Sequence, residues 1–320
     1  MKKKIVSVLI ATALTLSMAG CGSGAASNDG TYKVGVCQLI EHPALDAATN
    51  GFKDVLAEKL GDKVSFDVQN AQGEQPTAAT ICNGFVSANV DLILANATSP
   101  LQAAAAATTT IPILGTSVTD YGTALEVSDW AGTSGRNISG TCDLAPIDEQ
   151  ENMIVELFPS VKQVGLMYCS AEANSKYQIQ LMEKELDADG ITYKEYAIAD
   201  SNEIQSVFST AVTECDVLYI PTDNTLANST ETVRNIVVPA GIPVIAGEEG
   251  ICSGCGVASL SIDYYDLGRA TGEMAYEILV NGADISTMEV KYAPNVTKKY
   301  NAEIASELGV SIPDSYVVIE

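Results

Sequence analysis

Short apolar runs alternate with longer segments of helical periodicity along most of the chain. Apolar strands separated by amphipathic helices are typical of an α/β protein with parallel sheets. In the first part of the chain, the expected order is strand, helix, strand, helix, strand, helix, strand, over residues 32–39, 42–61, 64–71, 74–89, 90–96, 100–108 and 111–118.

The same order begins again near residue 160. The expected elements now cover residues 161–169, 175–190, 191–199, 202–214, 215–225 and 240–250. The stretch "VDLILANATSP" at 90–100 matches "CDVLYIPTDNT" at 215–225, and "IPILG" at 111–115 matches "IPVIAG" at 242–247. We therefore expect two Rossmann-like lobes of one topology; the alternative is a chance resemblance between two unrelated α/β domains.

The segments between and after these repeats are expected to form a hinge of several strands. Residues 115–146 are rich in Gly, Ser and Thr and are interpreted as the first crossing and the rim of a cleft. Residues 258–282 read as a strand that leads into a helix. Lobe 1 is predicted to comprise residues 31–143 and about 264–290, and lobe 2 residues 144–263 and about 291–320.

The N-terminus has the pattern of an export signal. Three lysines precede an apolar run from Ile5 to about Leu16, which is too short to span a bilayer. The tetrapeptide that ends at Cys21 resembles a bacterial lipobox, so residues 1–21 are predicted to be a lipoprotein signal with Cys21 lipidated. Residues 22–30, small and polar, are predicted to be a flexible tether. The alternative is an ordinary signal peptide with an incidental cysteine.

The charge balance argues against nucleic acid as a partner. The chain has 17 Lys and Arg against 41 Asp and Glu, and loss of the three N-terminal lysines leaves 14 basic residues and a formal charge of −27. Such a surface repels phosphate backbones. The content of 47% hydrophobic residues makes disorder a poor explanation of the chain.

The cysteines give no clear metal or redox motif. Besides Cys21 there are seven: Cys37, Cys82, Cys142, Cys169, Cys215, Cys252 and Cys255. An odd number outside the cell implies at least one free thiol. Cys252 and Cys255 have CxxC spacing, but no second CxxC exists and the single histidine, His42, is distant in sequence. We expect a loop disulfide or buried thiols rather than a zinc site, and no cofactor.

Polar residues follow the expected strand ends, where ligands bind in open parallel sheets because helix N-termini present free N–H groups there. When two such lobes face each other, both sets of strand ends line one cleft. The candidates are Glu41, His42, Asn70, Asn96, Thr98, Ser99, Thr119 and Asp120 in lobe 1, Tyr168, Ser170, Asn174, Thr222, Asp223, Asn224, Glu248 and Glu249 in lobe 2, and Asp263 near the return hinge.

These side chains suit an amino acid as ligand. Hydroxyls and amides beside a helix N-terminus suit a carboxylate, whereas Asp120, Asp223 or Glu248 would suit an ammonium group. Tyr168 at a strand end would stack on a flat apolar ligand. The alternative for Thr98, Ser99, Asp223 or Asn224 is a helix cap without ligand contact.

The segments "GVCQLIEHPALDAATNGF", "VQNAQGEQPT", "VDLILANATSP", "IPILGTSVTD" and "IPVIAGEEG" resemble the substrate-binding lipoproteins of ABC transporters, in particular the group for tryptophan and tyrosine uptake. The resemblance spans the mature chain. It implies a type I periplasmic-binding-protein-like fold that closes on a small ligand without catalysis, a membrane permease as partner, and a monomer lipid-anchored outside the cytoplasm. It assigns to the cleft Glu41, Asn70, Asn96, Thr98, Thr119, Asp120, Asp223, Asn224 and Glu248. The family pattern does not call for Cys252 or Cys255, and few rings are available to build an indole pocket.

Two further readings remain open from the sequence. Cys37 and Cys169, one on each first strand, suggest an amino-acid racemase with two opposed thiols, although their positions in the repeats do not match. A receptor of the same fold for a sugar or nucleoside is the other alternative. A repressor of this fold is excluded because residues 1–30 hold a signal and tether in place of a DNA-binding helix-turn-helix.

Overall fold

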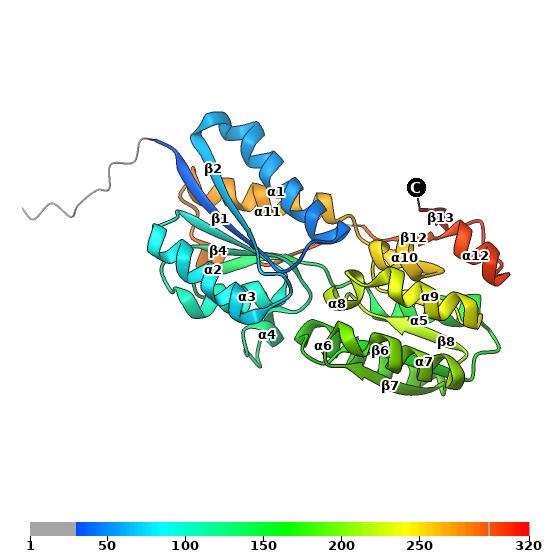
Figure 1. Ribbon diagram of the computed structural model, residues 1–320. Helices are drawn as coiled ribbons and strands as arrows, with labels where there is room; N and C mark the ends of the chain where they lie inside the picture. Colours follow the sequence, from blue (N-terminus) through cyan, green and yellow to red (C-terminus); the bar gives the residue numbers. More distant parts are fainter. Residues whose placement is uncertain (1–29, 294, 320) are drawn as a thin grey trace, which may run out of the picture.

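The computed structural model describes residues 30–293 and 295–319. Two α/β lobes lie side by side, each a mainly parallel sheet between two layers of helices (Figure 1). The predicted signal, Cys21 and nearly all of the predicted tether lie outside the described residues. Within the described residues, no helix has the length and hydropathy needed to cross a membrane.

Lobe 1 is built on a six-stranded sheet in the order β11-β5-β4-β3-β1-β2. Its elements are β1 (Tyr32–Gln38), α1 (Pro43–Leu60), the 3-10 turn η1 (Gly61–Lys63), β2 (Val64–Asn70), α2 (Gln75–Ala88), β3 (Leu92–Asn96), α3 (Thr98–Ala107), β4 (Ile113–Val118), α4 (Tyr121–Ala124), β5 (Ile138–Cys142), α11 (Tyr264–Leu279), η3 (Ile285–Thr287) and β11 (Lys291–Tyr292).

Lobe 2 is built on a seven-stranded sheet in the order β13-β12-β10-β9-β8-β6-β7. Its elements are α5 (Ile147–Leu157), β6 (Gln163–Cys169), α6 (Ala173–Asp189), β7 (Thr192–Ile198), η2 (Ser201–Glu203), α7 (Ile204–Glu214), β8 (Val217–Ile220), α8 (Asn224–Ala227), α9 (Thr230–Ala240), β9 (Val244–Ala246), α10 (Glu249–Cys255), β10 (Ala258–Ser261), β12 (Thr297–Tyr300), α12 (Ala302–Leu308) and β13 (Val317–Val318). Strand β12 runs antiparallel to β10.

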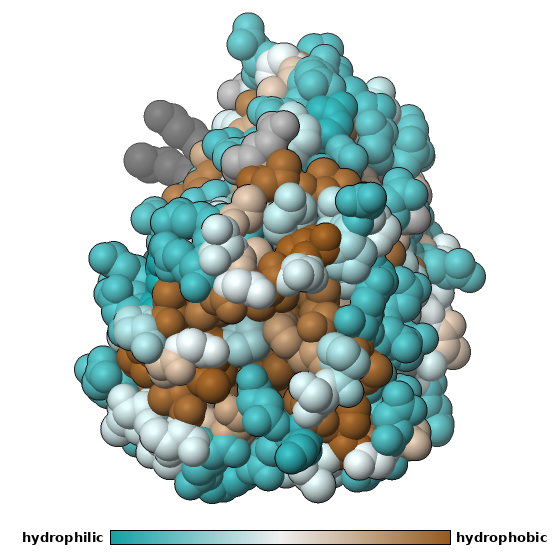
Figure 2. Space-filling view, turned by 90° about the vertical axis from the view of Figure 1, so that its right-hand side faces the viewer, coloured by the Kyte–Doolittle hydropathy of each residue, from teal (hydrophilic) through white to brown (hydrophobic). Residues whose placement is uncertain are grey.

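The strand patterns follow from position in the sheets. Central strands such as β3, with sequence LILAN, are buried along their whole length because helices cover both faces. The edge strands β2 and β7 alternate or are largely exposed, as their sequences VSFDVQN and TYKEYAI indicate. At the far end of lobe 2, the edge strand β13 exposes Val317 and Val318. Figure 2 views this end and shows apolar residues in the gaps between hydrophilic ones.

The chain crosses between the lobes three times, after β5, after β10 and between β11 and β12. The predicted boundary near residue 290 lies after Tyr292, because β11 pairs with β5 in the sheet of lobe 1. The returning helix α11 packs closely along α1 (Figure 1). A Cβ on Gly268 would lie 2.0 Å from the carbonyl oxygen of Ala48, so only glycine permits this approach.

The interpretation of residues 115–146 as loop and rim is incomplete. Strand β5 lies within it and forms an interior strand between β4 and β11. Its sequence, ISGTC, is fully buried yet carries hydroxyls and glycine instead of an apolar run. Thr141 satisfies its hydroxyl on Thr271 and Thr116, which lets a polar strand occupy the interior.

Candidate functional site

A cavity of about 440 Å³ lies between the lobes at the carboxyl ends of their strands. This is where ligands bind in open parallel sheets, and the volume is within the range of small-molecule sites. Lobe 1 lines it with Leu39, Ile40, Gln72, Gly73, Glu74, Gln75, Pro76, Thr98, Ser99 and Gln102. Lobe 2 lines it with Cys169, Ala171, Glu172, Ala173, Asn174, Ala199, Asp200, Ser201, Asn224, Thr225, Asn228 and Ser229. We call it the interlobe cavity.

The junction of β3 and α3 forms part of the lobe 1 wall. Ala97 turns the chain with φ of 98°, and α3 begins directly after it without a side-chain cap. The hydroxyls of Thr98 and Ser99 are buried and have no hydrogen-bond partner among the described residues. The N-terminus of a ten-residue helix also carries free N–H groups and partial positive charge. This wall can therefore receive an anionic group or several acceptor atoms.

Glu172 organises the opposite wall in lobe 2. Its Oε1 accepts hydrogen bonds from the Thr225 N–H and hydroxyl, both at 2.8 Å. Its Oε2 accepts from the Asn224 N–H at 3.0 Å, from Asn224 Nδ2 at 2.6 Å and from Asn174 Nδ2 at 3.0 Å. Five donors thus fix this carboxylate at the start of α8.

All charged side chains among the described residues that line the interlobe cavity are negative. Three carboxylates line it, from Glu74, Glu172 and Asp200, and none of its described lining residues is Lys or Arg. A ligand with an ammonium group is favoured in such a field, and a ligand with several negative charges is not. Together with the start of α3, the cavity suits a zwitterion. No group of three His, Cys, Asp or Glu side chains in the described part of the chain is arranged to hold a metal ion.

Two polar contacts join the lobes beside the cavity. His42 Nε2 lies 3.1 Å from Asn224 Oδ1, and the hydroxyls of Thr119 and Thr222 lie 3.4 Å apart. Thr119 also donates to Asp143 Oδ1 at the first hinge crossing, where Asp143 Oδ2 accepts from Tyr264. Side chains of lobe 1 and lobe 2 are therefore in direct contact at two places beside the cavity.

Comparison with known proteins decides what kind of molecule this is. A family model described as ABC transporter substrate binding protein matches residues 33–319. The chain belongs to this family. The tyrosine-binding protein of Clostridioides difficile strain R20291 is 38% identical over 291 residues, which cover 87% of this chain and 84% of that protein. The family is non-enzymatic, which argues against the racemase.

Two solved structures are similar over almost the whole substrate-binding protein. The ABC domain from Streptococcus pneumonia in complex with L-Trp is 33% identical, covers 90% of this chain and 100% of that chain, and has a TM-score of 0.86. The ligand-free, open structure of a substrate binding protein with adhesive properties from Clostridium difficile is 37% identical, covers 91% and 99%, and has a TM-score of 0.70. The chain thus superposes more closely on the complex with L-Trp than on the ligand-free, open structure, although the latter is slightly more similar in sequence.

Four of the candidate site residues line the interlobe cavity of this substrate-binding protein: Thr98, Ser99, Asn174 and Asn224. The hydroxyls of Thr119 and Thr222 lie at the contact between the lobes and do not line the cavity. The Asn96 side chain is buried beneath it, where Nδ2 donates to the Leu45 carbonyl and the Thr49 hydroxyl.

Asp223 is enclosed within lobe 2. Its carboxylate accepts from the N–H groups of Cys169 and Leu226 and from the Ser175 hydroxyl, and only 1% of the residue is exposed. Burial raises its pKa to about 8 and the charge of Glu172 adds to the shift, while the three donors oppose it. This side chain caps α8 and ties it to β6.

The other predicted residues lie elsewhere. Asn70 accepts from the Gln72 N–H and shares a surface hollow of about 370 Å³ with Glu41. Asp120, Glu248 and Asp263 cap α4, α10 and α11. Burial raises the pKa of Glu248 to about 7. Tyr168 packs in the core and donates to Glu195, and Ser170 donates to the Ile198 carbonyl.

The seven cysteines in the described part of the chain are free, buried thiols, including Cys252 and Cys255 on α10. Cys37 packs against Cys82 inside lobe 1, whereas Cys169 lines the interlobe cavity. The two first-strand thiols therefore do not share a site.

Sequence reasoning missed two parts of the cavity wall. The turn at residues 72–76 follows β2, and residues 199–201 follow β7. The same rule about strand ends that selected Thr98 could have found both, because each segment directly follows the second strand of its lobe. Glu172 also follows a strand end, between Ser170 and Asn174, so the same rule could have found it. Its hydrogen bonds to Asn224 and Thr225 depend on α8, which is far away in sequence.

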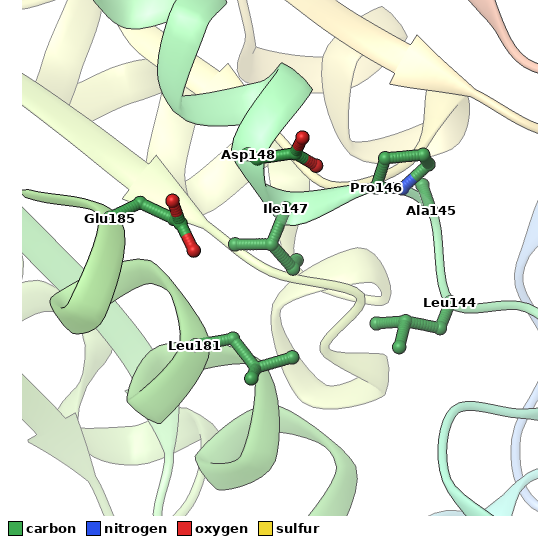
Figure 3. Close-up of a pocket in the computed structure, with 7 residues that line it drawn as sticks. All are labelled: Leu144, Ala145, Pro146, Ile147, Asp148, Leu181 and Glu185. Carbon is green, nitrogen blue, oxygen red and sulfur yellow. The ribbon is translucent and has the colours of Figure 1, made fainter.

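Other hollows share no lining residue with the interlobe cavity. One of about 450 Å³ lies beside the first hinge crossing, lined by Leu144–Asp148, Leu181 and Glu185 (Figure 3). Another of about 550 Å³ lies between the start of α1 and the caps Glu248 and Asp263. Neither of these two hollows is lined by a described buried hydroxyl without a hydrogen-bond partner.

Proposed function

We propose that this substrate-binding protein closes its lobes on an aromatic amino acid, tyrosine or tryptophan, and presents it to a membrane permease. The observation that carries the proposal is the pair of buried hydroxyls, Thr98 and Ser99, without partners at the start of α3. They lie in a cavity whose other wall carries carboxylates. A carboxylate on α3 and an ammonium group near Glu74 or Asp200 would satisfy both ends of an amino acid.

Apolar side chains supply the room for the ring. Leu39, Ile40, Pro76, Ala171, Ala173 and Ala199 line the same cavity. No aromatic residue is among its described lining residues, so the ring would be held by aliphatic contact instead of stacking. The printed names of the relatives, a tyrosine-binding protein and a complex with L-Trp, support this ligand class.

A thermal unfolding screen of the mature protein tests the ligand. L-tyrosine and L-tryptophan are expected to stabilise the fold, by about 2.7 kcal/mol at 100 times the dissociation constant. Tyramine, which lacks the carboxylate, and 3-(4-hydroxyphenyl)propionate, which lacks the ammonium group, are expected to have little effect. Stabilisation by a sugar or nucleoside and not by amino acids would overturn the proposal.

We infer further that Cys21 carries a lipid that holds the protein outside the cytoplasm. The lipobox-like tetrapeptide, the basic start and the polar residues 22–30 support this. Expression in a Gram-positive host with an alkyne-tagged fatty acid should label the wild type and not Cys21→Ala, which should appear in the medium. Equal labelling of the two would contradict the assignment.

A further inference from the structure

The contact between His42 and Asn224 has a defined polarity. Asn224 Nδ2 donates to Glu172 at 2.6 Å, so Asn224 turns its oxygen, and not its amide nitrogen, toward the imidazole. An oxygen there requires that His42 Nε2 carries the proton. The other nitrogen, Nδ1, is buried and has no partner among the described residues. His42 is therefore held as the neutral Nε2–H tautomer between the lobes.

Within residues 30–293 and 295–319, no side chain or carbonyl accepts a hydrogen bond from His42 Nδ1, so a second proton on this ring would lack an acceptor. The charged groups nearest to it are Glu172 across the interface and Asp46 on α1. Glu172 already accepts from five donors, and Asp46 Oδ1 accepts from Gln38 Nε2 at 2.6 Å. Burial lowers the pKa of His42 from 6.5, although the Asn224 contact and the charges of Glu172 and Asp46 act in the opposite direction.

We propose that His42 is a positioning residue: in the closed lobes its neutral imidazole holds Asn224, and through it Glu172, in place, so that ligand binding is coupled to loss of a proton. The proposal rests on the proposed function only in that a ligand closes the lobes. His42 does not itself line the cavity; its effect on the ligand passes through Asn224 and Glu172, which do.

The sign of the coupling follows from the open state. Separation of the lobes removes Asn224 and returns the ring toward water, where its pKa is near 6.5. The closed state thus binds fewer protons than the open state. Affinity should be constant above about pH 6.5 and fall as the pH drops toward the closed-state pKa, by at most about tenfold per pH unit for one proton.

Three buried acids in lobe 2 have raised pKa values and must be separated from His42. Burial raises the pKa of Asp223 to about 8 and those of Glu151 and Glu248 to about 7, and Glu248 faces the start of α1 across a hollow. All three remain unchanged in a His42→Gln variant, whose amide nitrogen can still donate to Asn224 but does not titrate. This variant is the matched control.

The test measures the dissociation constant of L-tyrosine from pH 5 to 8. The affinity of the wild type for L-tyrosine should fall below pH 6.5. His42→Gln should bind within about threefold of wild type at pH 7.5 and should not lose affinity below pH 6.5. His42→Ala should bind about tenfold more weakly at all pH values. The purification tag must contain no histidine, because His42 is the sole histidine of the chain. A pH-independent wild type, or the same slope in His42→Gln, would overturn the coupling.

A ligand-free arm separates this proposal from the proposed function. Absence of L-tyrosine and L-tryptophan binding at pH 7.5 would count against the function alone. Thr119→Cys/Thr222→Cys, at positions whose hydroxyls lie 3.4 Å apart across the interface, is oxidised to lock the lobes together. The pKa of the single histidine, read by NMR, should be below 6.5 in the cross-linked protein and should rise after reduction; equal values would refute the coupling.

Discussion

The junctions after the third strand of each lobe, β3–α3 and β8–α8, occupy equivalent places in the repeat but end in different chemical states. At β3–α3, the Thr98 and Ser99 hydroxyls are buried beside the cavity without partners. At β8–α8, the Asp223 carboxylate has three donors, and Asn224 bonds both Glu172 and His42.

The difference assigns separate tasks to the two junctions. A buried polar group without a partner costs free energy, so the lobe 1 junction is complete only when something else supplies the partner. At the lobe 2 junction, the side chains of Asp223 and Asn224 have their partners within the protein itself. Under the proposed function, equivalent positions in the two lobes thus divide into one that would receive the ligand and one that would support the site.

The largest effect is expected for Asp223→Ala. The substitution leaves two buried N–H groups and the Ser175 hydroxyl without their acceptor, so unfolding free energy should fall by about 3 kcal/mol or more. Urea denaturation measures it. Asp120→Ala, which removes a comparable cap from α4 in lobe 1, should cost only about 1 kcal/mol because it has one backbone donor.

The alternative outcome for Asp223 is informative. Were Asp223→Ala to unfold at the wild-type urea concentration and yet lose L-tyrosine, the carboxylate would belong to the ligand site. The distinction between a finished junction in lobe 2 and an unfinished one in lobe 1 would then be wrong.

Removal of the unpartnered hydroxyls should have a smaller effect, and it should lower ligand affinity instead of stability. Ser99→Ala and Thr98→Val should each weaken L-tyrosine binding about tenfold, or about 1.4 kcal/mol, because each loses a hydrogen bond to the ligand carboxylate. Their unfolding free energies should stay within about 0.5 kcal/mol of wild type, since no protein partner is lost. Calorimetric titration and urea denaturation read the two quantities.

Ser170→Ala is the matched control for this pair. Its hydroxyl donates to the Ile198 carbonyl and is not among the residues that line the cavity. It should change stability slightly and affinity not at all. Equal loss of affinity in Ser170→Ala and Ser99→Ala would mean that the hydroxyls act through the fold and not through contact with the ligand.

The sequence indicated the fold well because buried parallel strands read as apolar runs and because the runs repeat. Strand β5 was not predicted, because its sequence ISGTC is not an apolar run. Its buried hydroxyls find their hydrogen-bond partners only in the folded protein. For the site, the strand-end rule selected the edge of each sheet at which the interlobe cavity lies. It could not separate Thr98 from Asp223, because that depends on which donors the folded chain brings to each side chain.

The smallest effects are expected at the opposite ends of the same strands, where the two lobes are alike. Lys33 N–H donates to Asp91 Oδ2 at 2.7 Å while Asp91 N–H donates to the Lys33 carbonyl, and Gln163 and Asp216 repeat this exchange. Asp216 Oδ2 also accepts from the Lys162 N–H at 2.8 Å. These carboxylates hold the start of the first strand in each lobe.

Asp91→Ala and Asp216→Ala should therefore lower the unfolding free energy by about 0.5 and 1 kcal/mol, with L-tyrosine affinity unchanged in both, because exposed or half-buried hydrogen bonds contribute modestly to stability. Urea denaturation and calorimetric titration check the two halves of this expectation. A loss of affinity from either variant would show that the amino ends of the strands also differ in function. Unchanged affinity would confine the division of tasks to the carboxyl ends, where the cavity lies.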